Sequence, residues 1–338
     1  MKKQGLRYAV AENGLELPVI DVTHPEFALS VTDQQQQELV EQFVRQQEPF
    51  ERMPEWFRKG MRSFWARRSV LARVLGTADG TYLSGLNTYL LKLGPNNLDA
   101  VSSFPLDRRI AASAPVVSIR LRLQDVATLL AQFLAPLLES RPDAPLYLFN
   151  IAGGPAMDSL NAILLLKRDH PRLIEGRRIF IEVLDLDTAG PAFGARALSA
   201  LSEPGAPLHG VNVDMKRRAY DWSRPGELPS LMAEATRDQA VIAVSSEGGL
   251  FDYGSDDEIV GNLKMLHDAE LVVGSVTRAD ELMQKMHRSS KVPLKLRGHQ
   301  AFSELAARAG WQTARVLERP ICDQVALVRE LPRRADAS

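Results

Sequence analysis

The chain has very little cysteine, with Cys322 as the single one among its 338 residues. One cysteine excludes an internal disulfide framework and a cysteine-rich zinc site, and it fits a reducing compartment. The sequence also lacks any uninterrupted apolar run near the roughly 20 residues that span a bilayer. Its first residues are too polar for the apolar region of a signal peptide. We therefore expect a cytoplasmic protein with no membrane partner.

Net charge is also nearly absent, because 41 basic residues face 42 acidic ones. Without a net positive charge the chain lacks the general attraction to phosphate on which non-specific nucleic-acid binding depends, so we expect no nucleic-acid partner. No compact group of histidines and carboxylates stands at ligand spacing, which argues against a metal site. What is present is ordinary for a globular protein: 45% hydrophobic and 25% charged residues.

Two regions differ in their hydrophobic patterns. Residues 1–143 favour helices, with apolar residues at helical spacing in 33–44, 54–75, 87–93 and 124–138. Residues 144–332 alternate short apolar runs with helical segments, and 333–338 form a tail. Strands are predicted at 146–151, 178–184, 210–213, 240–244, 270–276, 312–317 and 323–328. This alternation predicts an α/β fold with a Rossmann-like, mostly parallel sheet and an antiparallel C-terminal hairpin.

A turn rich in small residues follows the first predicted strand. Open α/β sheets bind ligands beyond the carboxyl ends of their strands, near the first strand. Small residues there let the backbone approach a ligand closely, and the start of the next helix offers free N–H groups. A plain strand-to-helix turn would have the same composition. The candidate cofactor contacts are Asn150, Ala152, Gly153, Gly154, Pro155 and Asp158.

Polar groups also end the next three predicted strands. Asp185, followed by Leu186, could accept hydrogen bonds from both ribose hydroxyls of an adenosine-containing ligand. Asp214 could accept one from the adenine amine, while Met215 covers the ring. Each acid taken singly could instead cap the following helix. The fourth strand ends in a further pair of candidates, Ser245 and Ser246.

With these residues the sequence resembles the class I S-adenosylmethionine-dependent methyltransferases, whose first-strand motif is Asp-x-Gly-x-Gly-x-Gly. Asn150 stands at the acid position, and Ala152, Gly154 and Ala156 stand at the three glycine positions. The acids after strands two and three fall on Asp185 and Asp214. Residues 247–253 are similar to the Glu-Gly-Leu-x-x-Tyr segment of the leucine carboxyl and polyketide O-methyltransferase branch.

The resemblance implies S-adenosyl-L-methionine as the cofactor. It also implies in-line methyl transfer to an oxygen or nitrogen of a small acceptor. Nearby aromatic residues indicate that this acceptor is aromatic or cyclic. Glu247 and Tyr253 are the catalytic candidates beside the methyl group, together with Ser246 and Phe251, and His299 is a candidate base or anion-binding group. The N-terminal helices would cover the cleft, with Tyr82, Asn87 and Tyr89 lining the acceptor pocket. A homodimer is possible.

Two other functions remain open. Asn150, Ala152 and Ala156 depart from the motif, which suggests a methyltransferase scaffold retained for binding or assembly. An alanine would still fit where the glycine served close packing and not a positive φ. A nicotinamide-dependent oxidoreductase would also use a glycine turn, although usually with the tighter Gly-x-Gly-x-x-Gly spacing.

Overall fold

A seven-stranded sheet forms the centre of the molecule. The computed structural model describes residues 2–77, 83–288 and 293–329. The strand order is β5-β4-β3-β6-β7-β9-β8. All neighbours from β5 to β7 pair in parallel, while β9 is antiparallel to both β7 and β8. The mostly parallel sheet with an antiparallel C-terminal hairpin is therefore confirmed. Its strands are β3 (Leu146–Ile151), β4 (Arg178–Leu184), β5 (Asn212–Arg218), β6 (Val241–Ser246), β7 (Leu271–Thr277), β8 (Trp311–Leu317) and β9 (Cys322–Arg329).

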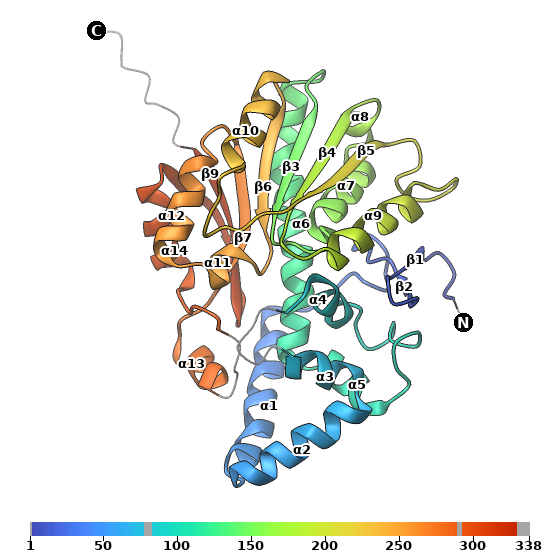
Figure 1. Ribbon diagram of the computed structural model, residues 1–338, viewed down its shortest axis with the longest axis vertical. Coiled ribbons are helices and arrows are strands. Elements are labelled where there is room, and N and C mark those ends of the chain that lie inside the picture. Colours follow the sequence, from blue (N-terminus) through green and yellow to red (C-terminus); the bar gives the residue numbers. More distant parts are fainter. Residues whose placement is uncertain (1, 78–82, 289–292, 330–338) are drawn as a thin grey trace.

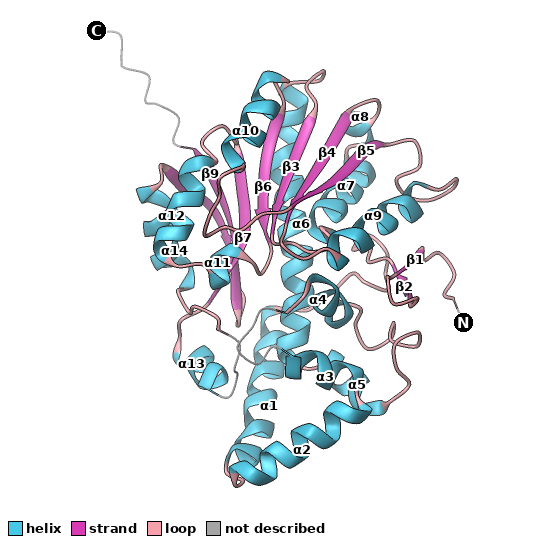
Figure 2. Cartoon of the chain, in the orientation of Figure 1, coloured by secondary structure: helices cyan, strands magenta, loops and turns pink. Residues whose placement is uncertain are grey.

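The sheet is covered by helices on both faces, which is why its central strands read as continuous apolar runs. In β3, Leu146 and Leu148 point into one hydrophobic core and Tyr147 and Phe149 into the other. Figure 2 shows the helices flanking the strands. The first core includes residues of α6 (Ala114–Ser140), α7 (Met157–Asp169) and α9 (Ala189–Ser202), and the second those of α10 (Leu228–Arg237), α12 (Asp256–Met265) and α14 (Gly298–Arg308).

Helix α6 is longer than the predicted segment 124–138 and packs directly against one face of the sheet. It contacts α7 and strands β6, β7 and β9. It is long and apolar enough to cross a membrane by length and composition alone, but 56% of its most apolar window is buried inside the protein. A core helix of this kind meets the same criterion. The region expected as a helical cap thus contributes one of the helices that cover the sheet.

The remaining N-terminal helices gather at one end of the sheet (Figure 1). They are α1 (Asp33–Glu51), α2 (Glu55–Arg68), α3 (Val70–Thr77), α4 (Gly85–Lys92) and α5 (Pro105–Ala111). The single helix predicted over 54–75 is wrong, because the chain is extended at Ser69. There the buried carboxylate of Asp107 accepts hydrogen bonds from the Ser69 hydroxyl at 2.6 Å and from the Leu71 amide at 2.7 Å. The Asp107 carboxylate therefore caps the N-terminus of a second helix, α3.

The short elements escaped prediction. Strands β1 (Tyr8–Val10) and β2 (Glu16–Pro18) form a hairpin that packs against α9. Helices α8 (Pro171–Ile174), α11 (Leu250–Tyr253) and α13 (Glu281–Arg288) complete the described elements. The strand order reverses at β3, whose neighbours are β4 and β6. A crevice is expected at such a reversal, beyond the carboxyl ends of the strands.

Candidate functional site

A cavity of about 1920 Å³ lies between the carboxyl ends of the strands and the N-terminal helices. Typical small-molecule pockets enclose about 300–1,000 Å³, so this one has room for two molecules side by side. On the sheet side it is lined by the segments that follow β3, β4, β5 and β6. On the opposite side it is lined by residues of α1 to α6 and α13. The expected crevice at the reversal of strand order is therefore present.

The turn after β3 is supported from below by a buried polar cluster. The Asn150 amide donates to the Asp158 carboxylate at 2.6 Å and to the Ser245 hydroxyl at 3.0 Å. A Cβ on Gly153 would lie 1.7 Å from Asn150 Oδ1, so only glycine fits over this amide. Burial, and next the charge of Glu247, raise the pKa of Asp158. Asn150, Asp158 and Ser245 are buried and do not line the cavity, so their predicted contact with a cofactor is corrected to support of the turn.

The turn itself lines the cavity through Ala152, Gly153, Gly154 and Pro155. Ala152 has a φ of 54° and Gly154 one of 55°, and Ala156 at the start of α7 has a φ of 53°. The expectation that alanine stands only where positive φ is not needed is therefore wrong. Both alanines adopt the left-handed conformation that glycine adopts more easily. The backbone keeps the shape of a glycine turn.

Asp185 lies directly after β4 and lines the cavity, as predicted from the sequence. Its Oδ2 accepts from the Gly154 amide at 2.9 Å, and its Oδ1 accepts from the Asp187 amide at 2.8 Å. Burial raises the pKa of Asp185 despite these two backbone donors. The carboxylate thus joins the ends of β3 and β4, and each oxygen keeps a further lone pair for a ligand. Leu186, 64% exposed, lines the same part of the cavity.

The predicted position of Asp214 and Met215 at the end of the third strand is wrong. β5 continues to Arg218, and these two residues pair with Phe180 and Ile181 in the middle of β4. Asp214 forms an ion pair with Lys216 at 2.8 Å, and Met215 packs against the hydrophobic core. An edge strand with one exposed face alternates apolar and charged residues, so its charged second half resembled a loop.

The residues that follow the true end of β5 do line the cavity. They are Tyr220, Asp221, Trp222 and Ser223. The Asp221 carboxylate accepts from the Ser223 hydroxyl at 2.7 Å and from the Ser223 amide at 2.9 Å, and these bonds lower the pKa of Asp221. An acid between two aromatic residues was the signal available in the sequence. It was missed because the strand was ended too early.

The loop after β6 carries a buried ionic cluster. Glu247 lines the cavity and forms ion pairs with Lys92 of α4 and with Arg122 of α6, the latter at 2.6 Å. Burial opposes ionisation, but the two cations outweigh it and hold the pKa of Glu247 below its usual range. Arg122 also lies 3.6 Å from the carboxylate of the buried Asp252. Glu247 is therefore ionised and neutralised by two cations, which makes it a poor proton acceptor.

Ser246 and Phe251 support this loop from inside the fold and do not line the cavity. The Ser246 hydroxyl donates to the Ile151 carbonyl at 3.2 Å and accepts from the Leu250 amide at 3.0 Å. The Phe251 ring packs against Phe302, with ring centroids 4.6 Å apart. The predicted ligand contacts of both residues are thus corrected to structural roles. Tyr253, in contrast, lines the cavity.

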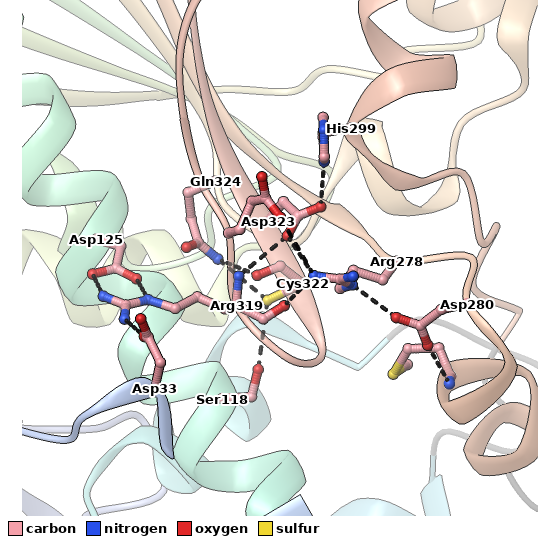
Figure 3. Close-up of polar contacts among 12 residues, drawn as sticks. Asp33, Ser118, Asp125, Arg278, Asp280, His299, Arg319, Cys322, Asp323 and Gln324 are labelled. Carbon is pink, nitrogen blue, oxygen red and sulfur yellow. Dashed lines mark hydrogen bonds and ion pairs between the residues drawn. The ribbon is translucent and has the colours of Figure 1, made fainter. Parts of the chain in front are cut away.

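His299 is not part of the cavity lining. Its Nδ1 lies 2.9 Å from Asp323 Oδ2, and the other oxygen of that carboxylate lies 3.7 Å from Arg278 (Figure 3). The same figure shows Arg319 of the β8–β9 connection paired with Asp125 of α6. The prediction of His299 as a base is wrong, because its ring belongs to this network of the C-terminal hairpin.

The three acceptor-lining candidates have different outcomes. Tyr82 lies outside the described residues. Asn87 does not line the cavity, whereas the buried Tyr89 does. The Tyr89 hydroxyl donates to the Pro18 carbonyl at 2.6 Å and accepts from the Ile20 amide at 3.1 Å, so its polar end holds the N-terminal segment. Burial raises the pKa of Tyr89.

Helix α4 begins directly on the glycine turn. A Cβ on Gly85 would lie 2.6 Å from the Cα of Gly154 and 3.4 Å from the Cα of Gly190. The Gly85 amide donates to the Asp187 carboxylate at 3.1 Å. Three glycines thus allow the starts of α4 and α9 and the turn after β3 to meet backbone to backbone. Within the described ranges, no group of three or more histidine, cysteine or acidic residues is arranged to hold a metal ion.

Comparisons with known proteins give similarity to solved structures only. No family model matches the chain, and no curated protein sequence matches it. The riboflavin-analogue dimethyltransferase RosA from Streptomyces davawensis is 14% identical, with a TM-score of 0.36, and the match covers 68% of this chain and 60% of that one. The pyocyanin biosynthetic protein PhzM is 13% identical, with a TM-score of 0.40 and the same coverages of 68% and 60%. A DUF574 family protein from Streptomyces avermitilis is 13% identical, with a TM-score of 0.41, over 62% of this chain and 84% of that one.

Similarity at these TM-scores, all below 0.5, does not define the fold. The strand connections define it. The parallel strands reverse their order at β3, and an antiparallel hairpin closes the sheet after α14. The resemblance noted in the sequence implied this combination of features. The chain has a Rossmann-like α/β fold with an antiparallel C-terminal hairpin.

Proposed function

We propose that the protein transfers a methyl group from S-adenosylmethionine to an oxygen or nitrogen of a small aromatic or cyclic acceptor held in the same cavity. The observation that carries the proposal is that one cavity reaches the ends of four adjacent strands and is closed on its other side by helices. It has room for a nucleoside cofactor on the sheet side and for an acceptor against the helices.

The residues on the sheet side fit the cofactor. The backbone of Ala152, Gly153 and Gly154 lines the cavity without large side chains. Asp185 would accept the ribose hydroxyls with its free lone pairs. Tyr220, Asp221 and Trp222 would surround the adenine, in the role expected of Asp214 and Met215. The methionine carboxylate would face the cationic groups of Lys92 and Arg122.

The cofactor supplies an activated methyl group on a sulfonium, and the chain's own contribution is alignment. In-line displacement depends on close approach and orientation, which a cavity walled by the strand ends and the helices provides. Glu247, on the loop after β6, is a carboxylate that lines the cavity. Both Lys92 and Arg122 form ion pairs with it. We therefore propose that Glu247 positions the two cations and that the acceptor needs no proton removal by this carboxylate. An ionised phenol or a carboxylate meets that requirement.

Calorimetric titration with S-adenosylhomocysteine tests the cofactor assignment. We expect the protein to bind it, and Asp185→Asn to weaken binding by about tenfold, or about 1.4 kcal/mol. The asparagine keeps one acceptor oxygen for the Gly154 amide but removes the acceptor of the Asp187 amide, so thermal denaturation checks that this variant is folded. Asp214→Asn is the matched control, because Asp214 is a strand-end candidate that the fold places away from the cavity. Its affinity should equal that of the unaltered protein.

Two results would reject the proposal. Tight binding of NAD together with no binding of S-adenosylhomocysteine would favour an oxidoreductase. Absence of binding of either ligand would favour a scaffold retained for assembly.

Turnover is tested separately. Release of S-adenosylhomocysteine during incubation with S-adenosylmethionine and a panel of phenols and aromatic acids would establish turnover and identify the acceptor.

A further inference from the structure

The charged residues of the cavity are divided between its two ends. Most carboxylates gather at the sheet end, and the cations that do not pair with them gather on the helical side. The sheet end carries Asp185, Asp187, Asp221, Glu247 and Glu258, while the helical side carries Arg58, Lys59, Arg62 and Arg109 with Glu55 as its acid. The sheet end suits hydroxyl groups and the sulfonium charge of the proposed cofactor. The helical end suits a negative charge.

Four charged residues of helix α2 lie along the rim of the cavity. Glu55, Arg58, Lys59 and Arg62 recur at the spacing of one helical face, and all four line the cavity. Three aromatic residues of the same helix are exposed, Trp56 by 75%, Phe64 by 44% and Phe57 by 39%, whereas the half-buried Trp65 lines the cavity. No residue of α2 is buried, and Arg58 is half-buried while Glu55, Lys59 and Arg62 are exposed. These charges therefore line the cavity where it opens to solvent.

Two of these cations have no carboxylate partner. Lys59 pairs with Glu55 at 3.1 Å. Across residues 2–77, 83–288 and 293–329, neither Arg58 nor Arg62 forms an ion pair, and the buried Nε of Arg58 has no hydrogen-bond partner. The guanidinium of Arg62 lies 6.0 Å from the centre of the Phe50 ring. Buried polar groups are almost always satisfied, so the unpaired Nε of the half-buried Arg58 points to a ligand, and the exposed Arg62 adds a second positive charge beside it.

The wall around the two arginines is apolar and partly aromatic. Phe43 and Phe50 of α1 and Trp65 of α2 line it, together with Leu106 and Ile110 of α5. Planar apolar surfaces of this kind accept an aromatic ring, and a guanidinium fork binds a carboxylate through two parallel hydrogen bonds.

We infer that the helical end of the cavity binds an aromatic acid, with Arg58 and Arg62 holding its anionic group and the α1 and α2 aromatics holding its ring. This inference rests on the proposed function and names the acceptor class of the same cavity. The acid group would lie at the helical end, and the methyl-accepting atom would point toward the sheet end.

A pair of fluorescent probes tests this assignment. Anilinonaphthalene sulfonate carries an aromatic body and one anionic group, and phenylnaphthylamine has the same kind of ring system without the charge. We expect tighter binding of the sulfonate. In the double variant Arg58→Gln, Arg62→Gln its affinity should fall by about tenfold, while that of the uncharged probe should change by less than about twofold. Arg67→Gln is the control, because this exposed arginine of α2 does not line the cavity.

Three results would overturn the inference: equal losses for both probes, an unchanged affinity for the sulfonate, or the same loss in Arg67→Gln. If only Trp56→Ala lost binding of the sulfonate probe, the probe would lie on the exposed face of α2, and this result would also overturn the inference. Titration of the double variant with S-adenosylhomocysteine separates this inference from the proposed function. The double variant should bind S-adenosylhomocysteine with unchanged affinity. If the unaltered protein did not bind S-adenosylhomocysteine, the proposed cofactor would be rejected while the probe result stayed valid.

Discussion

Ala152 is a strained residue at the scale of single side chains. Its φ of 54° is one that an L-residue adopts at a cost of about 1–2 kcal/mol, whereas glycine adopts it freely. Ala152→Gly is therefore expected to raise the free energy of unfolding by about 1 kcal/mol. Gln239→Gly should do the same, because Gln239 follows α10 with a φ of 52° and is exposed. Urea denaturation measures both, and Ala162→Gly inside α7 serves as the opposite control, since it should destabilise.

Glu247 links the stability of the fold to pH. Its pKa is lower in the folded chain than the value of about 4.3 for an unperturbed glutamate. The stabilisation is therefore complete above that ordinary value and is lost as the pH falls through the lower folded value. Glu247→Gln would leave Lys92 and Arg122 buried without their shared anion, at a cost of about 3–5 kcal/mol at neutral pH.

Urea unfolding at neutral and acidic pH measures this effect. The unaltered protein should lose more stability on acidification than the Glu247→Gln variant, because the variant lacks the titrating carboxylate. An equal loss in both proteins would show that Glu247 is not held ionised by its two cations.

The sequence predicted individual site residues only where the local chain determines them. Asp185 was found because it directly follows a short buried apolar strand. Lys92 and Arg122 were not found, since they reach Glu247 from helices 155 and 125 residues away along the chain. The lysine inside the apolar run 90–93 was the one local sign of a buried charge. Long-range pairing of this kind leaves no spacing pattern to read.

At the scale of elements, the start of α4 depends on the absence of a side chain at Gly85. A Cβ there would lie 2.6 Å from the Gly154 Cα and 3.3 Å from the Asp187 carboxylate. Because the Gly154 contact is with backbone, the neighbours cannot move aside easily. Gly85→Ala should destabilise the protein by about 1–3 kcal/mol and weaken binding of S-adenosylhomocysteine by displacing the glycine turn.

Gly60→Ala is the matched control for that change. Gly60 lies in α2, and a Cβ there would meet nothing within 4 Å. Alanine favours the helix over glycine by up to about 1 kcal/mol, so this variant should be neutral or more stable. A Gly85→Ala variant that behaved like Gly60→Ala in thermal denaturation would show that α4 does not pack tightly on the turn.

Helix and strand boundaries followed the same division between local and distant causes. The bounds of β3 and β4 were predicted correctly, because both strands are buried and apolar. The break between α2 and α3 was not predicted, since the carboxylate that produces it belongs to Asp107, 38 residues beyond Ser69. The end of β5 was missed because an edge strand can carry charged residues on its exposed face.

At the scale of the whole molecule, the cavity forms where two separately patterned regions meet. The alternation of strands and helices after residue 144 was sufficient to predict the sheet and its closing hairpin. The packing of the N-terminal helices was beyond prediction, because their contacts with the sheet join residues far apart in the chain. The position of Arg58 and Arg62 along the cavity is visible only after that packing is known.

The crystal structure of the protein with S-adenosylhomocysteine is the most direct test of the central claim that the sheet side of this cavity is the cofactor site. The account predicts ribose hydroxyls within about 3.2 Å of the Asp185 carboxylate, the adenine beside residues 220–222, and the vacant methyl position facing the helical side. A ribose bound away from Asp185, or a cofactor bound outside this cavity, would contradict it.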